Sequence, residues 1–147
     1  MSVIRKPDWQ QRLHEFLLAR GKQPFAWGKN DCALFAADAI QSFTGVDFAG
    51  DFRGKYTDEA GANATIKSVT AGSTVEDAAV HAAKQHGLVE WKTVMLAQRG
   101  DLALYQGSEG LAAGVVHLNG IHALFVTPTG LHKIPLRRCL RAWKVGQ

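Results

Sequence analysis

The sequence predicts an α+β fold in which helices come first and an antiparallel sheet follows. Up to about residue 87, apolar residues recur at helical spacing between capping residues, whereas from residue 100 onward short apolar runs alternate with turn residues. Helices followed by strands, without regular alternation of the two, are typical of α+β domains. The 147 residues fit a single domain, 1–147, which can bury a core without metal ions or disulfides.

The first predicted helix has Pro7 and Asp8 in its first turn and ends at Gly21. Pro and Asp suit a first helical turn, and Gly often follows a last one. Its apolar residues recur at i, i+4, i+7 and i+8: Trp9, Leu13, Phe16 and Leu17. This spacing predicts an amphipathic helix with one face on the core.

The second predicted helix runs to about Phe43, where Thr44 and Gly45 end it, and Asn30 is suited to cap its start. The residues expected on its inner face include a thiol: Cys32, Phe35, Ala36, Ala39, Ile40 and Phe43. We therefore expect the Cys32 side chain to point toward the sheet.

Two shorter helices are predicted after a loop over residues 46–56. The first covers about 57–69, and the second follows a capping box at 73–76, runs through Ala83 and ends at His86 and Gly87. The strands are then predicted at 101–106, 111–118, 121–126, 131–135 and 141–145. Asn119 and Gly120 give the strongest hairpin signal in the chain, because both residues tolerate positive φ.

Cys32 is the candidate nucleophile. A thiol in the first turn of a helix meets unpaired N–H groups and the positive end of the macrodipole, which lower its pKa. The alternative is that Cys32 packs as a small hydrophobic residue. Two cysteines in a chain of this size do not indicate a disulfide framework, so Cys32 and Cys139 are both expected to be reduced.

Several short motifs follow one another in order along residues 24–135. They are Pro24-Phe25-Ala26-Trp27-Gly28-Lys29-Asn30-Asp31-Cys32, then Arg99-Gly100-Asp101-Leu102-Ala103-Leu104, then Ala112-Ala113-Gly114-Val115-Val116-His117-Leu118-Asn119-Gly120 and Ile121-His122-Ala123. In this succession the sequence resembles the NlpC-type cell-wall cysteine peptidases, which are papain-like. It is similar also to a small phage and prophage family, found with tail genes, that shares the pattern Pro-Phe-x-Trp-Gly-x-x-Asp-Cys. The resemblance implies a papain-like NlpC-type fold with the Cys32 helix packed on the sheet.

One position departs from this resemblance. Where the family has its catalytic histidine, at the start of the strand that contains Gly114, this chain has Ala112, and His122 falls on the family's orienting position. His122 could act directly on Cys32. His117 is the other candidate, but an odd separation from Ala112 places it on the opposite face of a regular strand unless a bulge intervenes.

Three other residues near these motifs have two interpretations each. Trp27 is a candidate substrate-groove residue or a core aromatic. Asp31 is a candidate substrate-binding residue or an acid that stabilises the helix start, and its charge opposes formation of a thiolate at Cys32. Asp101 could take part in proton transfer or fix the turn into its strand, and we expect the second.

No cofactor or metal is expected. The residues of zinc-ligand type lack Cys-x-x-Cys or His-x-x-x-His spacing: Cys32, His117, His122, His132 and Cys139. The net charge of +4 concentrates late in the chain, on Lys133, Arg137, Arg138, Arg141 and Lys144. This is interpreted as a solvated face, so nucleic acid is not expected as a partner.

The resemblance implies two functions. One is a phage or prophage tail protein that hydrolyses the stem peptides of peptidoglycan through Cys32 and a histidine. The other is a catalytically inactive structural component that binds neighbouring proteins of the tail tip or hub. The chain shows neither a secretory signal nor a run of about 18 apolar residues, so we expect assembly in the host cytoplasm, a place in the virion tail and no membrane span.

Overall fold

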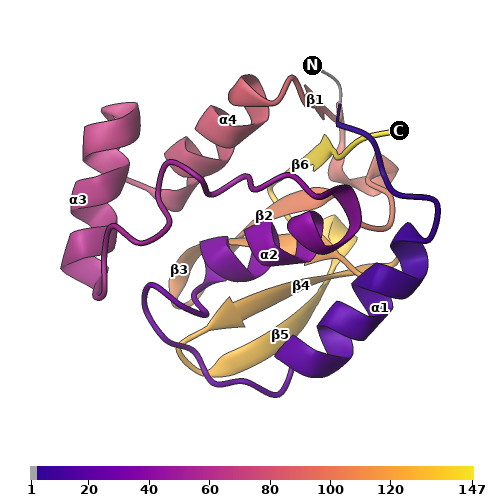
Figure 1. Ribbon diagram of the computed structural model, residues 1–147, viewed down its shortest axis with the longest axis horizontal. Coiled ribbons are helices and arrows are strands. Elements are labelled where there is room, and N and C mark those ends of the chain that lie inside the picture. Colours follow the sequence, from indigo (N-terminus) through magenta and orange to yellow (C-terminus); the bar gives the residue numbers. More distant parts are fainter. Residues whose placement is uncertain (1–2) are drawn as a thin grey trace.

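The computed structural model describes residues 3–147 and confirms the predicted α+β fold. Within these residues, four helices are followed by an antiparallel six-stranded sheet with the order β1-β6-β2-β3-β4-β5 (Figure 1). Two short 3₁₀ segments, η1 and η2, lie between strands. The elements are α1 (Trp9–Arg20), α2 (Cys32–Thr44), α3 (Glu59–Thr70), α4 (Val75–Gln85), β1 (Val89–Glu90), η1 (Val94–Leu96), β2 (Leu102–Gly107), β3 (Gly110–Val116), β4 (His122–Thr127), β5 (Gly130–Pro135), η2 (Leu136–Arg138) and β6 (Arg141–Lys144).

Two predicted helix starts were wrong by one residue. Asp31, not Asn30, caps α2, because its carboxylate accepts the N–H of Leu34 at 2.9 Å. The Asn30 side chain instead donates to the carbonyls of Gln23 and Pro24 and closes the preceding loop.

The capping box of α4 likewise starts one residue later than predicted. It joins Thr74 to Asp77 rather than Ser73 to Glu76. The Glu76 carboxylate is instead paired with Arg141 of β6 at 3.0 Å. Glu76, which the local pattern assigned to the cap, thus pairs with a residue far away in the sequence.

The main core lies between α2 and one face of the sheet. α2 crosses β3 and β4, α1 packs beside α2, and α4 reaches β3, with α3 outside it (Figure 1). The largest fully buried side chains come from both layers: Phe35, Phe43, Leu34 and Ile40 from α2, and Leu104, Val115 and Val126 from the strands. Because alternate residues of a strand face opposite sides, the other face of the sheet carries a separate cluster, rich in alanine.

Strand β3 is paired unequally with its two neighbours. Six residue pairs join it to β2, but only Val115↔Leu124 and Val116↔Ala123 join it to β4. At Gly114 the two strands come so close that a Cβ would lie 2.2 Å from the carbonyl oxygen of Leu124. The first part of β3 therefore lies without a β4 partner, next to the start of α2.

Asp101 is fully buried and holds together segments from both ends of the chain. Its carboxylate accepts hydrogen bonds from Arg5 at 3.0 Å, from the Trp91 indole at 2.8 Å and from the backbone of Val145 at 3.0 Å. It also accepts the N–H of Gln98 at 2.8 Å, which confirms its predicted role in the turn before β2. None of the helices in residues 3–147 is both long and apolar enough to span a membrane.

Candidate active site

Asp31 fastens the start of α2 to two loops. Besides capping Leu34, its carboxylate accepts the N–H of Gly28 at 3.0 Å and the hydroxyl of Tyr56 at 2.6 Å. Gly28 has φ of +78°, and a Cβ there would lie 2.4 Å from the Tyr56 carbonyl oxygen, so only glycine fits. These contacts explain the spacing of the Trp-Gly-x-x-Asp-Cys motif in structural terms.

Tyr56 is a residue of this site that the sequence analysis did not identify. Burial raises its pKa far above the usual range, and the hydrogen bond and charge of Asp31 raise it further. It therefore stays a neutral donor to Asp31. Tyr56 lies at the end of a loop 25 residues after Asp31, and no local pattern joins the two. Asp31 itself is only 2% exposed, and three donors occupy its carboxylate.

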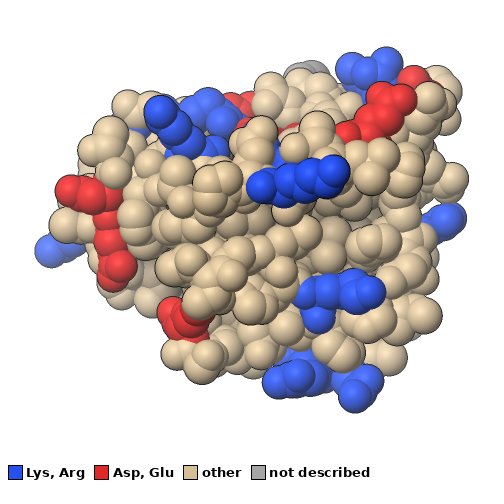
Figure 2. All heavy atoms as spheres, turned by 90° about the horizontal axis from the view of Figure 1, so that it is seen from below, with Lys and Arg blue, Asp and Glu red and all other residues tan. Residues whose placement is uncertain are grey.

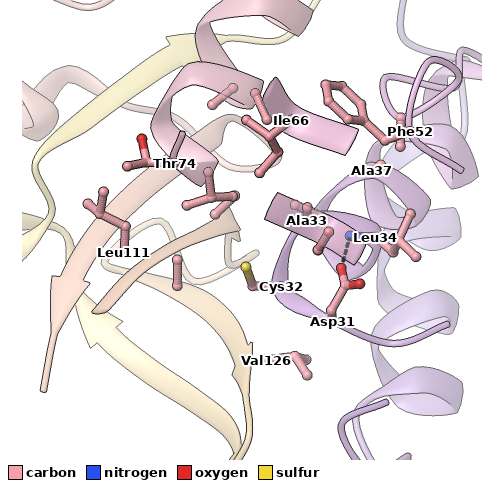
Figure 3. A pocket seen from close by; sticks show the side chains of 18 of the residues that line it. Asp31, Cys32, Ala33, Leu34, Ala37, Phe52, Ile66, Thr74, Leu111 and Val126 are labelled. Carbon is pink, nitrogen blue, oxygen red and sulfur yellow. Dashed lines mark hydrogen bonds between the residues drawn. The ribbon is translucent and has the colours of Figure 1, made fainter. Parts of the chain in front are cut away.

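Cys32 lines a cavity of about 340 Å³ between α2, α3, α4 and the start of β3. Its side chain projects from the first turn of α2 toward the strands (Figure 3). Ala112 and Ala113, on the part of β3 that β4 does not pair, line the cavity with it. The expectation that Cys32 points toward the sheet is confirmed.

The predicted lowering of the Cys32 pKa is wrong. Burial raises the pKa of this thiol to about 11, and the nearby negative charge of Asp31 adds to the increase. Backbone hydrogen bonds from Ala113 and from the helix start act in the opposite direction but are outweighed. At neutral pH Cys32 is therefore a thiol, not a thiolate.

Ala112 lies where the resemblance places the catalytic histidine. Ala112 and Cys32 line the same cavity and pack in the same hydrophobic cluster. A methyl group cannot accept the proton that a thiol must lose before it attacks. Cys32 and Ala112 therefore line one cavity, and Ala112 supplies no proton acceptor to it.

His117 and His122 lie at the other end of β3 and β4, around the Asn119 turn. The Nδ1 of His117 accepts the N–H of Asn119 at 2.9 Å, and the Asn119 amide lies 3.1 Å from Nδ1 of His122. His117 falls on the face opposite Ala112, as the parity predicts, and lines a groove with α1. Burial and the charge of Lys133 lower its pKa.

The structure does not bring these histidines to Cys32. Val126 of β4 lines the cavity, and His122 lies four residues before it on the same strand. Four residues of a strand span roughly 13 Å. Among the described residues, 3–147, no histidine lines this cavity. The remaining four are also elsewhere: His14, His81, His86 and His132.

Trp27 lines the cavity, and its ring meets the ring of Phe25 edge to face at 5.0 Å. It is half-buried, so it contributes both to packing and to the cavity wall. Cys32 and Cys139 are free thiols. Residues 3–147 contain no group of three His, Cys, Asp or Glu side chains arranged to hold a metal ion.

One of the late basic residues is paired. Arg141 forms ion pairs with Glu76 and Glu90. On the face seen in Figure 2, Lys and Arg side chains are separated by uncharged residues. On this face they form no continuous positive stripe of the kind typical of a nucleic-acid groove.

Comparison with solved structures defines the fold class. The chain is similar to the crystal structure of the NlpC/p60 domain of the peptidoglycan hydrolase SagA, with a TM-score of 0.57 and 14% sequence identity over 92% of this chain and 98% of that chain. At this identity the likeness concerns the fold. Residues 4–145 match the family described as Domain of unknown function (DUF6950), and the chain belongs to this family. No curated protein sequence matches it.

Proposed function

We propose that this protein is a binding component of a phage or prophage tail whose NlpC/p60-type site no longer hydrolyses peptides. The observation that carries the proposal is the surroundings of Cys32. Its thiol is neutral at physiological pH, Ala112 stands in place of a base, and the cavity wall in residues 3–147 contains no imidazole. A thiol without a proton acceptor is a poor nucleophile.

The tail assignment rests on the resemblance of the Pro-Phe-x-Trp-Gly-x-x-Asp-Cys segment to a family found with phage tail genes. Proteins of the tail tip or hub are the proposed partners, after assembly in the host cytoplasm. The structural role of Asp31 and Gly28 fits this proposal, since that motif holds the fold whether or not Cys32 reacts.

A second candidate is hydrolysis of peptidoglycan stem peptides by Cys32. It is favoured by the position of Cys32, which lines an accessible cavity in a fold shared with a peptidoglycan hydrolase domain. In that reaction the Cys32 sulfur would attack an amide carbon, and a base would take the thiol proton and pass it to the leaving amine. The described residues place no such base beside the sulfur.

Digestion of purified peptidoglycan distinguishes the two candidates. Wild-type protein and the Cys32→Ala variant are incubated with cell-wall sacculi, and released soluble peptides are separated by mass. We expect the same background from both proteins. Product from the wild type above that of the variant would overturn the proposed loss of hydrolysis.

The tail assignment has its own test. Particles induced from a strain that carries the gene are purified, and their proteins are identified by mass spectrometry and by labelled antibodies in electron micrographs. We expect the protein at the tail end of the particle. Its absence from purified particles would contradict the assignment.

A further inference from the structure

The cavity beside Cys32 is held open by alanines on the helices that enclose it. Small side chains cannot fill the space between α2, α3 and α4, and the described chain leaves about 340 Å³ there. The alanines that line it are Ala33, Ala36 and Ala37 from α2, Ala62 from α3, and Ala78, Ala79 and Ala82 from α4. A space of this kind between alanine faces suits an apolar ligand.

The rest of the wall is also largely apolar. Phe52, Ile66, Leu111 and Val126 surround the space into which Cys32 projects (Figure 3). Apolar walls of this extent bind by removing apolar surface from water. They offer few partners to the charged groups of a stem peptide.

The charged side chains that line the cavity are all acidic. Asp31 is buried and occupied by three donors, whereas Glu59 and Glu109 are exposed. Hydrogen bonds from Thr127 and Thr129 lower the pKa of Glu109, so it stays ionised. Among residues 3–147 no Lys or Arg lines the cavity, although the whole chain carries a net charge of +4.

We propose that this cavity binds an apolar peptide segment of a neighbouring protein, with a Lys or Arg of that segment placed against Glu59 and Glu109. The apolar walls favour apolar side chains, and the two exposed carboxylates favour a cation and repel an anion. This proposal rests on the proposed function, because it names the kind of segment through which a binding component would hold its partner.

Synthetic peptides test the proposal on the full chain. A panel of blocked pentapeptides carries apolar residues, drawn from Leu, Ile, Val, Phe and Met, followed by Lys, Gln or Glu. Binding is measured by calorimetry and by protection of Cys32 from N-ethylmaleimide. We expect the Lys peptides to bind about fivefold more tightly than their Gln counterparts, and the Glu peptides more weakly still.

Matched variants assign the binding to this cavity. Ala62→Leu fills the space, whereas Ala64→Leu adds the same group to the exposed side of α3, so only the first should abolish binding. Glu59→Gln and Glu109→Gln should each remove most of the Lys preference, and Glu15→Gln on α1 should not. Circular dichroism verifies that each variant is folded.

Any one of three results would overturn the proposal. The first is equal affinity for Lys and Glu peptides, and the second is equal peptide binding by Ala62→Leu and the wild type. The third is a protein that binds decyltrimethylammonium, an alkyl cation, but none of the peptides. The proposed function fails in a different assay, if the wild-type protein releases peptidoglycan fragments. Either result can therefore occur without the other.

Discussion

The two ends of strand β3 lie beside different residue types that a thiol protease needs. At its first end lies Cys32 of α2, whose burial keeps it protonated, with the methyl group of Ala112 beside it. The other end has His117 and His122, whose rings contact Asn119 of the turn. The contrast shows that the same residue types that predict catalysis can each be used for local structure when the fold keeps them apart.

The pH dependence of Cys32 alkylation tests whether a histidine activates the thiol, and it has the largest expected effect. Because burial raises the Cys32 pKa to about 11, the thiolate fraction, and with it the rate, should rise about tenfold per pH unit. Between pH 7 and pH 10 this amounts to about a thousandfold. Mass spectrometry after iodoacetamide treatment follows Cys32 directly. A rate that levels off near pH 7 would mean that a base activates the thiol after all.

Replacing Asp31 tests how much its hydrogen bonds to the start of α2 and to the two loops contribute to the free energy of unfolding. Asp31→Ala removes a helix cap and leaves the donors of Tyr56 and Gly28 without their acceptor, which should cost about 3 kcal/mol of unfolding free energy. Urea denaturation measures it. Asp58→Ala, which removes the exposed cap of α3, is the control and should cost about 1 kcal/mol. Equal losses would show that the contacts of Asp31 beyond the cap contribute nothing.

A histidine introduced beside Cys32 should make this thiol more reactive. In Ala112→His an imidazole would enter the cavity beside the sulfur, and an ion pair with the thiolate would lower the Cys32 pKa. Alkylation at pH 7.5 should then be at least about tenfold faster than in the wild type. Gln106→His, on an exposed position of β2, provides the control and should leave the rate unchanged. An unchanged rate in Ala112→His would indicate that position 112 does not reach the sulfur.

Removing the existing histidines should have the smallest effect. His117→Ala and His122→Ala remove rings that do not line the Cys32 cavity, so the alkylation rate should change less than about twofold. The same mass-spectrometric assay applies. A tenfold fall for His122→Ala would restore the dyad that the sequence suggested and would contradict the separation described here.

The fold was predictable because its signals are local. Helical spacing at Trp9, Leu13 and Phe16 and the turn at Asn119 depend on neighbours in the chain, and both appear as predicted. The order of elements also confirmed the papain-like arrangement. What the sequence did not indicate were contacts across the chain, such as β1 with β6 and Tyr56 with Asp31.

The site was predictable only in part. The sequence identified Cys32 and the departure at Ala112, and the structure places both at one cavity. The ionisation of Cys32 was not predictable, because it depends on burial by α3, α4 and β3, which no motif records. The local pattern also did not show which of Asn30 and Asp31 caps α2. Asp31 does, because the Asn30 side chain is hydrogen-bonded within the preceding loop.

The carboxylate of Asp101 brings segments near the two ends of the described chain together. It accepts hydrogen bonds from the Arg5 side chain and from the backbone N–H of Val145. A short linker should therefore join the ends, and new termini opened at an exposed turn away from the cavity, such as 54–55, should be tolerated in a circular permutant. Among the described residues, the cavity is lined by side chains from Phe25 to Pro128, so none of the segments that meet at Asp101 near the chain ends belongs to its wall.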